Sequence, residues 1–228
     1  MSIRPGRPLL VLLAAVAVLA SAAAVRAQVV VDRTVATVSD GVRTELITYS
    51  DLLWQLALQP GVPLERPRRE DLQKALQLLI DQRIFALEAQ RLPRAAPTEK
   101  EISDKIAELL TFFPSTAEFE RRLRAVGFDS VRDDNFEGII SQRIAIEKYL
   151  DFRFRSFVVV TAEDEAEYYR GTWVPEFRRR TPNAIVPELD RVRAEVVAEV
   201  TEERVARSIE QFLEQARQRV TVTTLYEP

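Results

Sequence analysis

The stretch between Val35 and Ile47 most constrains the fold, because it has the pattern of a β-hairpin that cannot stand alone. A short apolar run over residues 35–38 is followed by Ser39-Asp40-Gly41, and a second run returns through Val42 to Ile47. Glycine adopts positive φ without penalty, so Asp-Gly between two apolar runs is a strong turn signal. Two strands alone are marginal in water. We therefore expect the rest of the chain to supply a third strand and a helical layer.

The third strand is expected at the far C-terminus. Residues 220–225, Val-Thr-Val-Thr-Thr-Leu, are β-branched and alternate in polarity, which is typical of a strand. Most of the chain between the hairpin and this segment has helical periodicity. We predict a mostly α (α+β) fold, with several helices around a long central helix. A small antiparallel sheet would form from the N-terminal hairpin and the C-terminal strand.

Local signals place the helices. Apolar residues recur at helical spacing over residues 51–58, 68–90, 98–113, 115–126, 130–155 and 188–219. Thr48 or Ser50 is expected to cap the first helix, and Thr98 and Ser115 each begin a Thr/Ser-x-x-Glu capping box. The segment 130–155 is apolar over a wide arc, which predicts a central helix contacted from two sides. In the last segment, Thr201 followed by two glutamates predicts a kink or a restart.

Residues 1–27 have the pattern of a secretory signal peptide. Arg4 and Arg7 precede an apolar run from Leu9 to Val25, and Val25-Arg26-Ala27 resembles a small-x-small cleavage site. The run is shorter than the roughly 20 residues that a spanning helix needs. We therefore expect export to the periplasm, and an uncleaved N-terminal anchor, the one expected route to a membrane, is the alternative. Cleavage would remove three arginines and no acid, which changes the net charge from −3 to −6.

Composition excludes several classes of function. The chain has no cysteine and no histidine, which rules out Cys/His zinc sites, disulfides and any triad built on histidine. It has six glycines and neither a GxGxxG nor a GxxxxGK[ST] motif, so we expect no nucleotide site and no cofactor. A modestly acidic chain is a poor candidate for nucleic-acid binding. A carboxylate-only active site stays open, although no metal site is expected.

The hairpin and the first helix resemble the N-terminal segment of the SurA family of periplasmic chaperones and folding factors. That family begins with Val/Ile-Asp-x-x-Val-Ala-x-Val and later has Ile-Thr-x-Ser-Asp-Leu. The matching residues here are Val31, Asp32, Val35, Ala36, Val38, Ile47, Thr48, Ser50, Asp51 and Leu52. The resemblance continues through 78–84, through the helix punctuation of 98–128, and through Val160-Thr161 to Tyr168-Tyr169.

The resemblance also implies a domain organisation. In the family, the segment matching 160–169 precedes a parvulin-type prolyl isomerase domain, but here only residues 171–187 stand in that place. Domains seldom fall below about 50 residues. We therefore expect a signal peptide at 1–27, a SurA N-terminal-like chaperone domain at 28–170, a linker or wrapped loop at 171–187, and a C-terminal helix and strand at 188–228 that complete the same domain.

The expected function is binding without catalysis. The resemblance implies an ATP-independent holdase that binds unfolded outer-membrane or periplasmic proteins in a groove between helices, with an apolar floor and a charged rim. The alternative is a non-catalytic scaffold or interaction subunit for one envelope partner. A residual prolyl isomerase is a further rival, which the missing domain disfavours.

The expected client-binding residues are aromatic: Phe112, Phe113, Phe119, Phe128 and Trp173. Phe112 and Phe113 are adjacent, so one would be core and the other would pack under the Pro114 turn or line the groove. Trp173 would be either a fold anchor or a client contact, since aromatic residues are enriched in both roles. Helix-end packing is favoured for the phenylalanines of 152–157, a solvated loop for the arginines of 178–180, and helix N-terminal electrostatics for the acids of 163–167.

Overall fold

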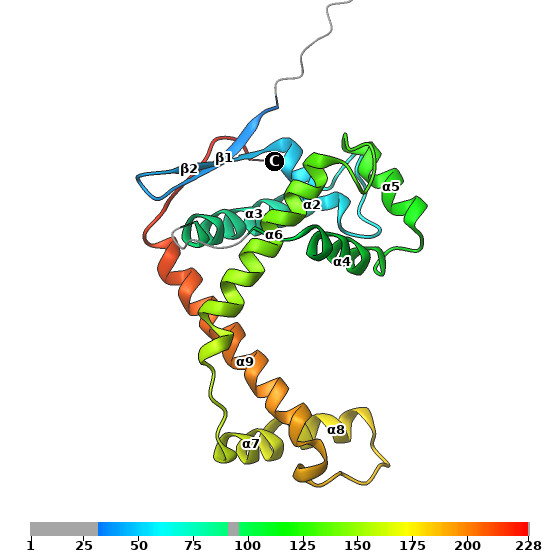
Figure 1. Cartoon of the computed structure of the whole chain (residues 1–228), viewed down its shortest axis with the longest axis vertical. Helices are drawn as coiled ribbons and strands as arrows, with labels where there is room; N and C mark the ends of the chain where they lie inside the picture. The colour runs from blue at the N-terminus through cyan, green and yellow to red at the C-terminus, as the bar shows by residue number, and fades with distance from the viewer. Residues whose placement is uncertain (1–31, 91–95, 228) are drawn as a thin grey trace, which may run out of the picture. The chain divides into compact units, whose positions relative to one another are not determined.

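A three-stranded antiparallel sheet and a larger set of helices make up the part of the chain that the computed structural model describes, residues 32–90 and 96–227 (Figure 1). The mostly helical α+β prediction is confirmed. The predicted signal peptide, residues 1–27, lies outside the described residues.

The sheet is built as the hairpin pattern predicts. Strand β1 (Thr34–Ser39) pairs antiparallel with β2 (Thr44–Thr48) on one side and with β3 (Thr221–Thr224) on the other, in the order β2-β1-β3. Gly41 has φ +85°, which glycine adopts without strain. The Asp40 carboxylate accepts hydrogen bonds from the backbone N–H groups of Val42 and Arg43 at 3.0 and 2.7 Å. The far C-terminus therefore completes the sheet.

The helices follow the apolar periodicity closely. Their bounds are α2 (Tyr49–Ala57), α3 (Arg69–Ala89), α4 (Glu99–Leu110), α5 (Thr116–Ala125), α6 (Asp134–Arg153), the 3₁₀ turn η1 (Arg155–Phe157), α7 (Ala162–Tyr168), the π-helical η2 (Tyr169–Trp173), α8 (Val174–Arg180) and α9 (Leu189–Arg217). Thr48 and Thr98 are reciprocal capping boxes with Asp51 and Glu101. Ser115 caps α5 through the Glu118 N–H, but the Glu118 side chain pairs with Arg121 instead of closing the box.

Besides the open box at Ser115, two further local predictions are wrong. Helix α9 is continuous through Thr201, whose Oγ1 donates to the Val197 carbonyl at 2.7 Å, so no restart occurs. The predicted loop at 171–187 is helical as far as Arg180, because η2 and α8 continue α7 without a break. Pro175 lies in the first turn of α8, directly after the π-helical turn η2, and the helical backbone continues through it.

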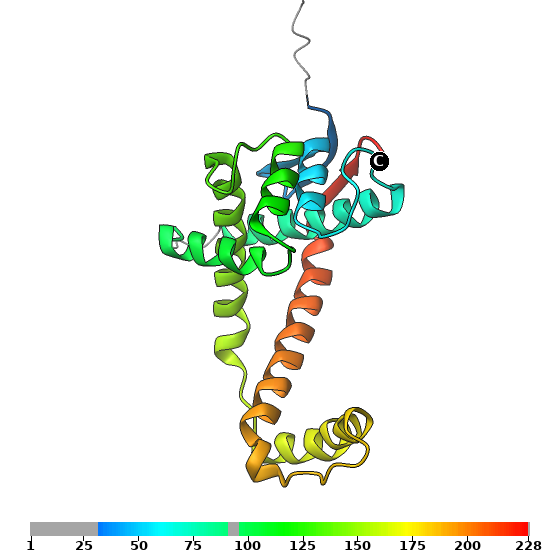
Figure 2. The same ribbon diagram turned by 90° about the vertical axis from the view of Figure 1, so that its right-hand side faces the viewer.

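Apolar clusters hold these elements together. One cluster joins the sheet to α2, α3 and Ala216 of α9, and a second, rich in phenylalanine, joins α4, α5 and α6. A third, separate cluster centres on Trp173 and packs η2 and α8 against Val196 and Val200 of α9. Figure 2 shows α9 running from the α7–α8 end to the sheet, so this one helix takes part in both ends of the fold.

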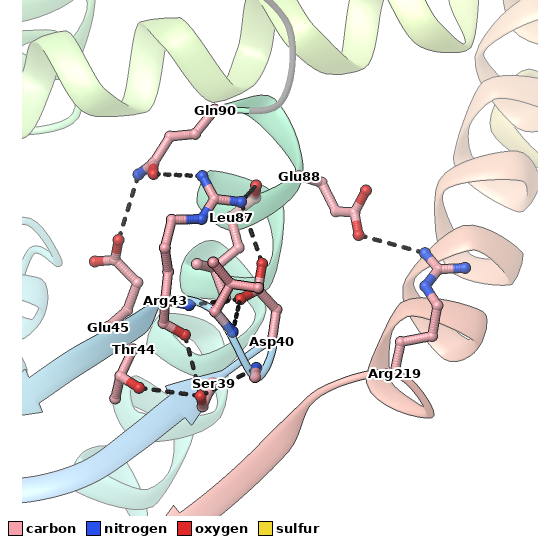
Figure 3. Close-up of polar contacts among 11 residues, drawn as sticks. Ser39, Asp40, Arg43, Thr44, Glu45, Leu87, Glu88, Gln90 and Arg219 are labelled. Carbon is pink, nitrogen blue, oxygen red and sulfur yellow. Dashed lines mark hydrogen bonds and ion pairs between the residues drawn. The ribbon is translucent and has the colours of Figure 1, made fainter.

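The last turn of α3 fixes both the hairpin and the return to β3. The Arg43 guanidinium donates to the Leu87 carbonyl and to Gln90 Oε1, both at 2.9 Å, and pairs with Asp40 at 3.2 Å (Figure 3). Arg219, just before β3, pairs with Glu88 at 3.4 Å. These contacts attach both the β1–β2 turn and the segment that leads into β3 to the C-terminal end of α3.

Candidate functional site

A groove of about 490 Å³ lies along α4, the segment before α6, and the start of α6. Ile106 is buried, and Leu110 and Val131 are half-buried, so these residues form an apolar base. Ala107 also lines the groove and is exposed. Charged Glu99 and Arg132 lie exposed around this base, together with the half-buried Glu137. The groove therefore has an apolar floor and a charged rim of both signs.

Two ion pairs between α4 and α6 hold the walls of this groove. Lys148 of α6 pairs with Glu101 of α4 at 2.5 Å, and Lys105 of α4 pairs with Glu147 of α6 at 3.0 Å. The Lys148 hydrogen bond, aided by the Thr98 backbone N–H, lowers the pKa of Glu101 to about 2. Glu101 therefore stays ionised at neutral pH and both caps α4 and ties it to α6.

A phenylalanine cluster supports the groove from beneath. Phe119 lies 4.6 Å from Phe113 and 5.9 Å from Phe136, measured between ring centroids, and Phe128 lies 5.6 Å from Phe136. Tilted and edge-on pairs of this kind add to the gain from burial itself. The cluster fixes α4, α5 and α6 in one arrangement.

Arg122 of α5 closes the end of α2. Its guanidinium donates to the carbonyls of Leu56, Ala57, Gln59 and Val62 at 2.9 to 3.0 Å. Helix C-termini leave carbonyls without intrahelical partners, and a cation there also complements the helix dipole. Burial lowers the pKa of the Arg122 guanidinium, which nonetheless remains charged at neutral pH. One side chain thus satisfies a helix end and the loop that follows it.

Four of the five predicted client-binding residues lie in the core, which corrects their assignment to a contact surface. Phe119 is 0% exposed, Trp173 2%, Phe128 4% and Phe113 7%, whereas Phe112 is 62% exposed. Phe113 enters the phenylalanine cluster, and its neighbour Phe112 therefore points elsewhere. Adjacent residues at a helix end cannot share one face, and packing decided between them.

Trp173 is a fold anchor. Its ring stacks between Tyr169 at 5.6 Å and Phe177 at 5.0 Å, and its Nε1 donates to Glu195 of α9 at 3.2 Å. Of the two roles that the sequence leaves open, the structure selects the packing role. Phe154 likewise packs on Phe212 of α9 at 5.4 Å, as the helix-end hypothesis predicts.

Some exposed apolar residues were not singled out as client contacts by sequence reasoning. Phe152 is 54% exposed and Phe157 71%, and their rings lie 6.5 Å apart at the end of α6, next to the 72% exposed Val159. The groove residues Ala107, on α4, and Val131, in the turn before α6, gave no sequence signal either, because isolated alanine and valine residues are ordinary. The one sequence feature that marked this region was the alternation of Phe152 and Phe154 with arginines.

The acidic segment 163–167 has a structural role. Asp164 caps α7 in a box with Thr161 and pairs with Arg204, and these contacts lower its pKa to about 2. Glu165 pairs with Arg193. Across residues 32–90 and 96–227, no three acidic side chains gather in a geometry that would hold a metal ion. Within the same ranges, none of the helices has the length and apolar content to cross a bilayer.

Comparison of the chain with models of protein families and with curated proteins gave no match. The likeness to the SurA family therefore rests on the residues quoted from the sequence and remains a proposal.

Proposed function

We propose that this chain is an ATP-independent holdase of the periplasm, SurA-like but without an isomerase domain, which binds extended segments of unfolded outer-membrane or periplasmic proteins. The observation that supports it best is the open groove beside α4, with its apolar base and its rim of both charges. Such a surface binds many sequences, because binding requires only an apolar side chain on an extended polar backbone. The activity is binding and release, with no turnover.

The size of the groove fits weak and reversible binding. Full burial of one aliphatic or aromatic side chain gains about 1.5–3 kcal/mol, and association costs several kcal/mol in lost freedom. A groove of this volume takes one or two client side chains at a time. Client molecules therefore leave without nucleotide hydrolysis when their own folding competes for the same side chains.

Further exposed aromatic residues add contacts along a long client. Phe112 follows α4, and Phe152 and Phe157 lie at the far end of α6. An extended chain spans about 3.3 Å per residue, so one unfolded polypeptide reaches several such surfaces. Linked weak contacts raise the overall affinity without a tight site.

The test is light scattering from an unfolded porin diluted into buffer, with and without stoichiometric protein that lacks residues 1–27. We expect suppression without ATP. Ala107→Glu places a charge in the groove lining and should reduce suppression severalfold, because a bound client would bury an unpaired carboxylate. Ala117→Glu is the matched control, since Ala117 is also an exposed helical alanine but does not line the groove. Phe112→Ser should give a smaller loss.

Circular dichroism of each variant must first show unchanged helix content. Equal suppression by Ala107→Glu and Ala117→Glu would move the client surface away from the groove. No suppression of several unrelated clients by the unmodified protein would overturn the holdase proposal and favour a scaffold for a single envelope partner.

A further inference from the structure

The two edge strands of the sheet differ in how far side chains protect their backbone groups. Strand β2 forms one edge and β3 the other, with β1 between them. Edge strands expose unpaired backbone groups, and natural proteins protect them with charges, proline or covering side chains. Residues 221–224, Thr-Val-Thr-Thr, include neither a charge nor a proline, and all four are exposed. Strand β3 therefore lacks the charges and proline that protect many natural edge strands.

The pairing register shows which backbone groups face outward. The Leu225 N–H donates to the Val35 carbonyl at 2.8 Å, and Thr223 lies opposite Thr37 and Thr221 opposite Ser39. Hydrogen-bonded and non-hydrogen-bonded pairs alternate along an antiparallel ladder. Residues 221, 223 and 225 therefore direct their backbone groups to β1, and Val222 and Thr224 direct theirs to the open edge.

At the β2 edge two of the outward backbone groups have side-chain partners. By the same alternation, Thr44, Leu46 and Thr48 face away from β1. Arg83 of α3 donates from Nε to the Leu46 carbonyl at 3.3 Å, and the Asp51 carboxylate accepts from the Thr48 N–H at 2.9 Å. In the described part of the chain, β3 pairs with β1 alone. Side chains thus cover part of the β2 edge, whereas no strand of the described residues pairs with the outer side of β3.

Side-chain contacts also flank strand β3 at both ends. Before it, Arg219 pairs with Glu88 of α3. After it, the Tyr226 ring lies 3.4 Å from the Arg33 guanidinium, and Glu227 pairs with Arg69 at 2.8 Å. A strand fixed in this way loses little conformational freedom when a further strand binds, which lowers the entropic cost of association.

We propose that the free edge of β3 accepts an extended polypeptide segment as a fourth strand, and this inference rests on the proposed function in taking unfolded polypeptide as the partner. The alternating N–H and C=O groups of Val222 and Thr224 continue the β1–β3 ladder, and another extended backbone is the group that matches them. The exposed Val222, Leu225 and Tyr226 offer apolar contacts to alternate side chains of that segment. Backbone recognition of this kind is independent of client sequence.

A flexible segment suits this edge better than a second copy of the chain. Strand β3 has four residues, so two copies paired through it would share few hydrogen bonds. Stable protein interfaces bury roughly 1,200–2,000 Å² in total, which a contact of this length does not reach alone. An extended client needs only the short ladder and gains the remaining affinity from the groove.

The test is residue-specific amide hydrogen exchange by NMR on the protein without residues 1–27. The probe is the heptapeptide Lys-Thr-Val-Thr-Val-Thr-Lys, with a control peptide that is N-methylated at alternate residues and cannot form a ladder. At ten times the dissociation constant, exchange at the Val222 and Thr224 amides should slow about tenfold. The N-methylated peptide should give no slowing.

Val222→Pro removes one outward N–H and leaves the β1 ladder intact, since proline is tolerated on the outer side of edge strands. It should weaken heptapeptide binding severalfold, whereas Val222→Thr, which keeps the N–H, should not. Unchanged exchange at Val222 and Thr224 in a protein that still suppresses porin aggregation would overturn this inference and leave the holdase proposal standing. Protection without peptide that grows with protein concentration would assign the edge to a second copy instead.

Discussion

The two ends of α9 belong to regions that are stabilised in different ways. The sheet region, which comprises the sheet with α2 to α6, has extensive apolar clusters and packs on Phe212 and Ala216 of α9. The tryptophan region, α7 to α8, has one small cluster centred on Trp173, packed on Val196 and Val200 of the same helix. In the sheet region many side chains share the stabilisation, whereas in the tryptophan region a single ring is central.

The difference indicates that α9 connects two regions, the sheet region and the tryptophan region, whose local stabilities should differ. Proteins open locally as cooperative units whose free energies differ, and small clusters open first. The chain provides one reporter for each region, because its two tryptophans are Trp54, which donates to the Val126 carbonyl, and Trp173. Replacing either tryptophan with phenylalanine leaves a fluorescence signal from the other region alone.

The largest expected effect comes from Trp173→Ala. Truncating a buried aromatic residue costs about 3–5 kcal/mol, and Trp173 is the one aromatic residue among the three buried residues of its cluster. We expect residues 162–180 to lose amide-exchange protection while Trp54 fluorescence keeps its native unfolding midpoint. A Trp54 transition shifted as far as in Phe119→Ala would contradict the separation of the two regions.

Arg122→Ala should be next in size and should act on the sheet region. Hydrogen bonds from charged groups are worth roughly 1.5–3 kcal/mol, and the substitution leaves the end of α2 without its cap. In a Trp173→Phe background, the urea midpoint reported by Trp54 should fall by an amount equivalent to about 2–3 kcal/mol. Arg121→Ala is the matched control, because Arg121 is 71% exposed and pairs with Glu118 on the surface of the same helix, so its effect should be below about 1 kcal/mol.

A matched pair of helix caps sharpens the comparison. Thr98 begins α4 and Thr161 begins α7, each in a reciprocal capping box. Replacing an N-cap threonine with alanine typically costs about 1 kcal/mol. Thr98→Ala should therefore shift the Trp54 transition, and Thr161→Ala should shift the Trp173 transition only. Equal shifts of both reporters in either variant would show that the two regions unfold together.

The smallest expected effect is a loss of stability at low pH, which should occur in both regions. The pKa values of Glu101 and Asp164 are lowered from 4.5 and 3.8 to about 2 by hydrogen bonds and cationic partners. Because the folded pKa is the lower one, their stabilisation is complete above about pH 4.5 and is lost as the pH falls towards 2. Urea unfolding between pH 5 and pH 2 should show the loss, with Glu101→Gln flattening the Trp54 series and Asp164→Asn the Trp173 series. A variant with an unaltered pH dependence would exclude its carboxylate as the cause.

Short sequence patterns were sufficient to predict those features that depend only on neighbouring residues. The Asp-Gly turn, the Thr98 cap and the β-branched C-terminal strand were predicted, and Thr48 was one of the two caps expected for the first helix, because each depends on residues within one turn or one strand. Alternation and periodicity predicted the fold class for the same reason. The segment 171–180 was missed since Gly171 and Pro175 look like loop residues, while its helix depends on Trp173 packing against α9.

By itself, the sequence determined most of the helices and strands, and it predicted that the hairpin and the C-terminal strand would share one sheet, because backbone propensity and hydrophobic period are local properties. Tertiary structure alone decided which aromatic residues are buried and where the open surfaces lie. Phe112 and Phe113 are identical in chemistry, and only the position of α5 makes one core and the other surface. Among the described residues, the open edge of β3 was also decided by tertiary structure, because whether a strand has a partner depends on what lies beside it.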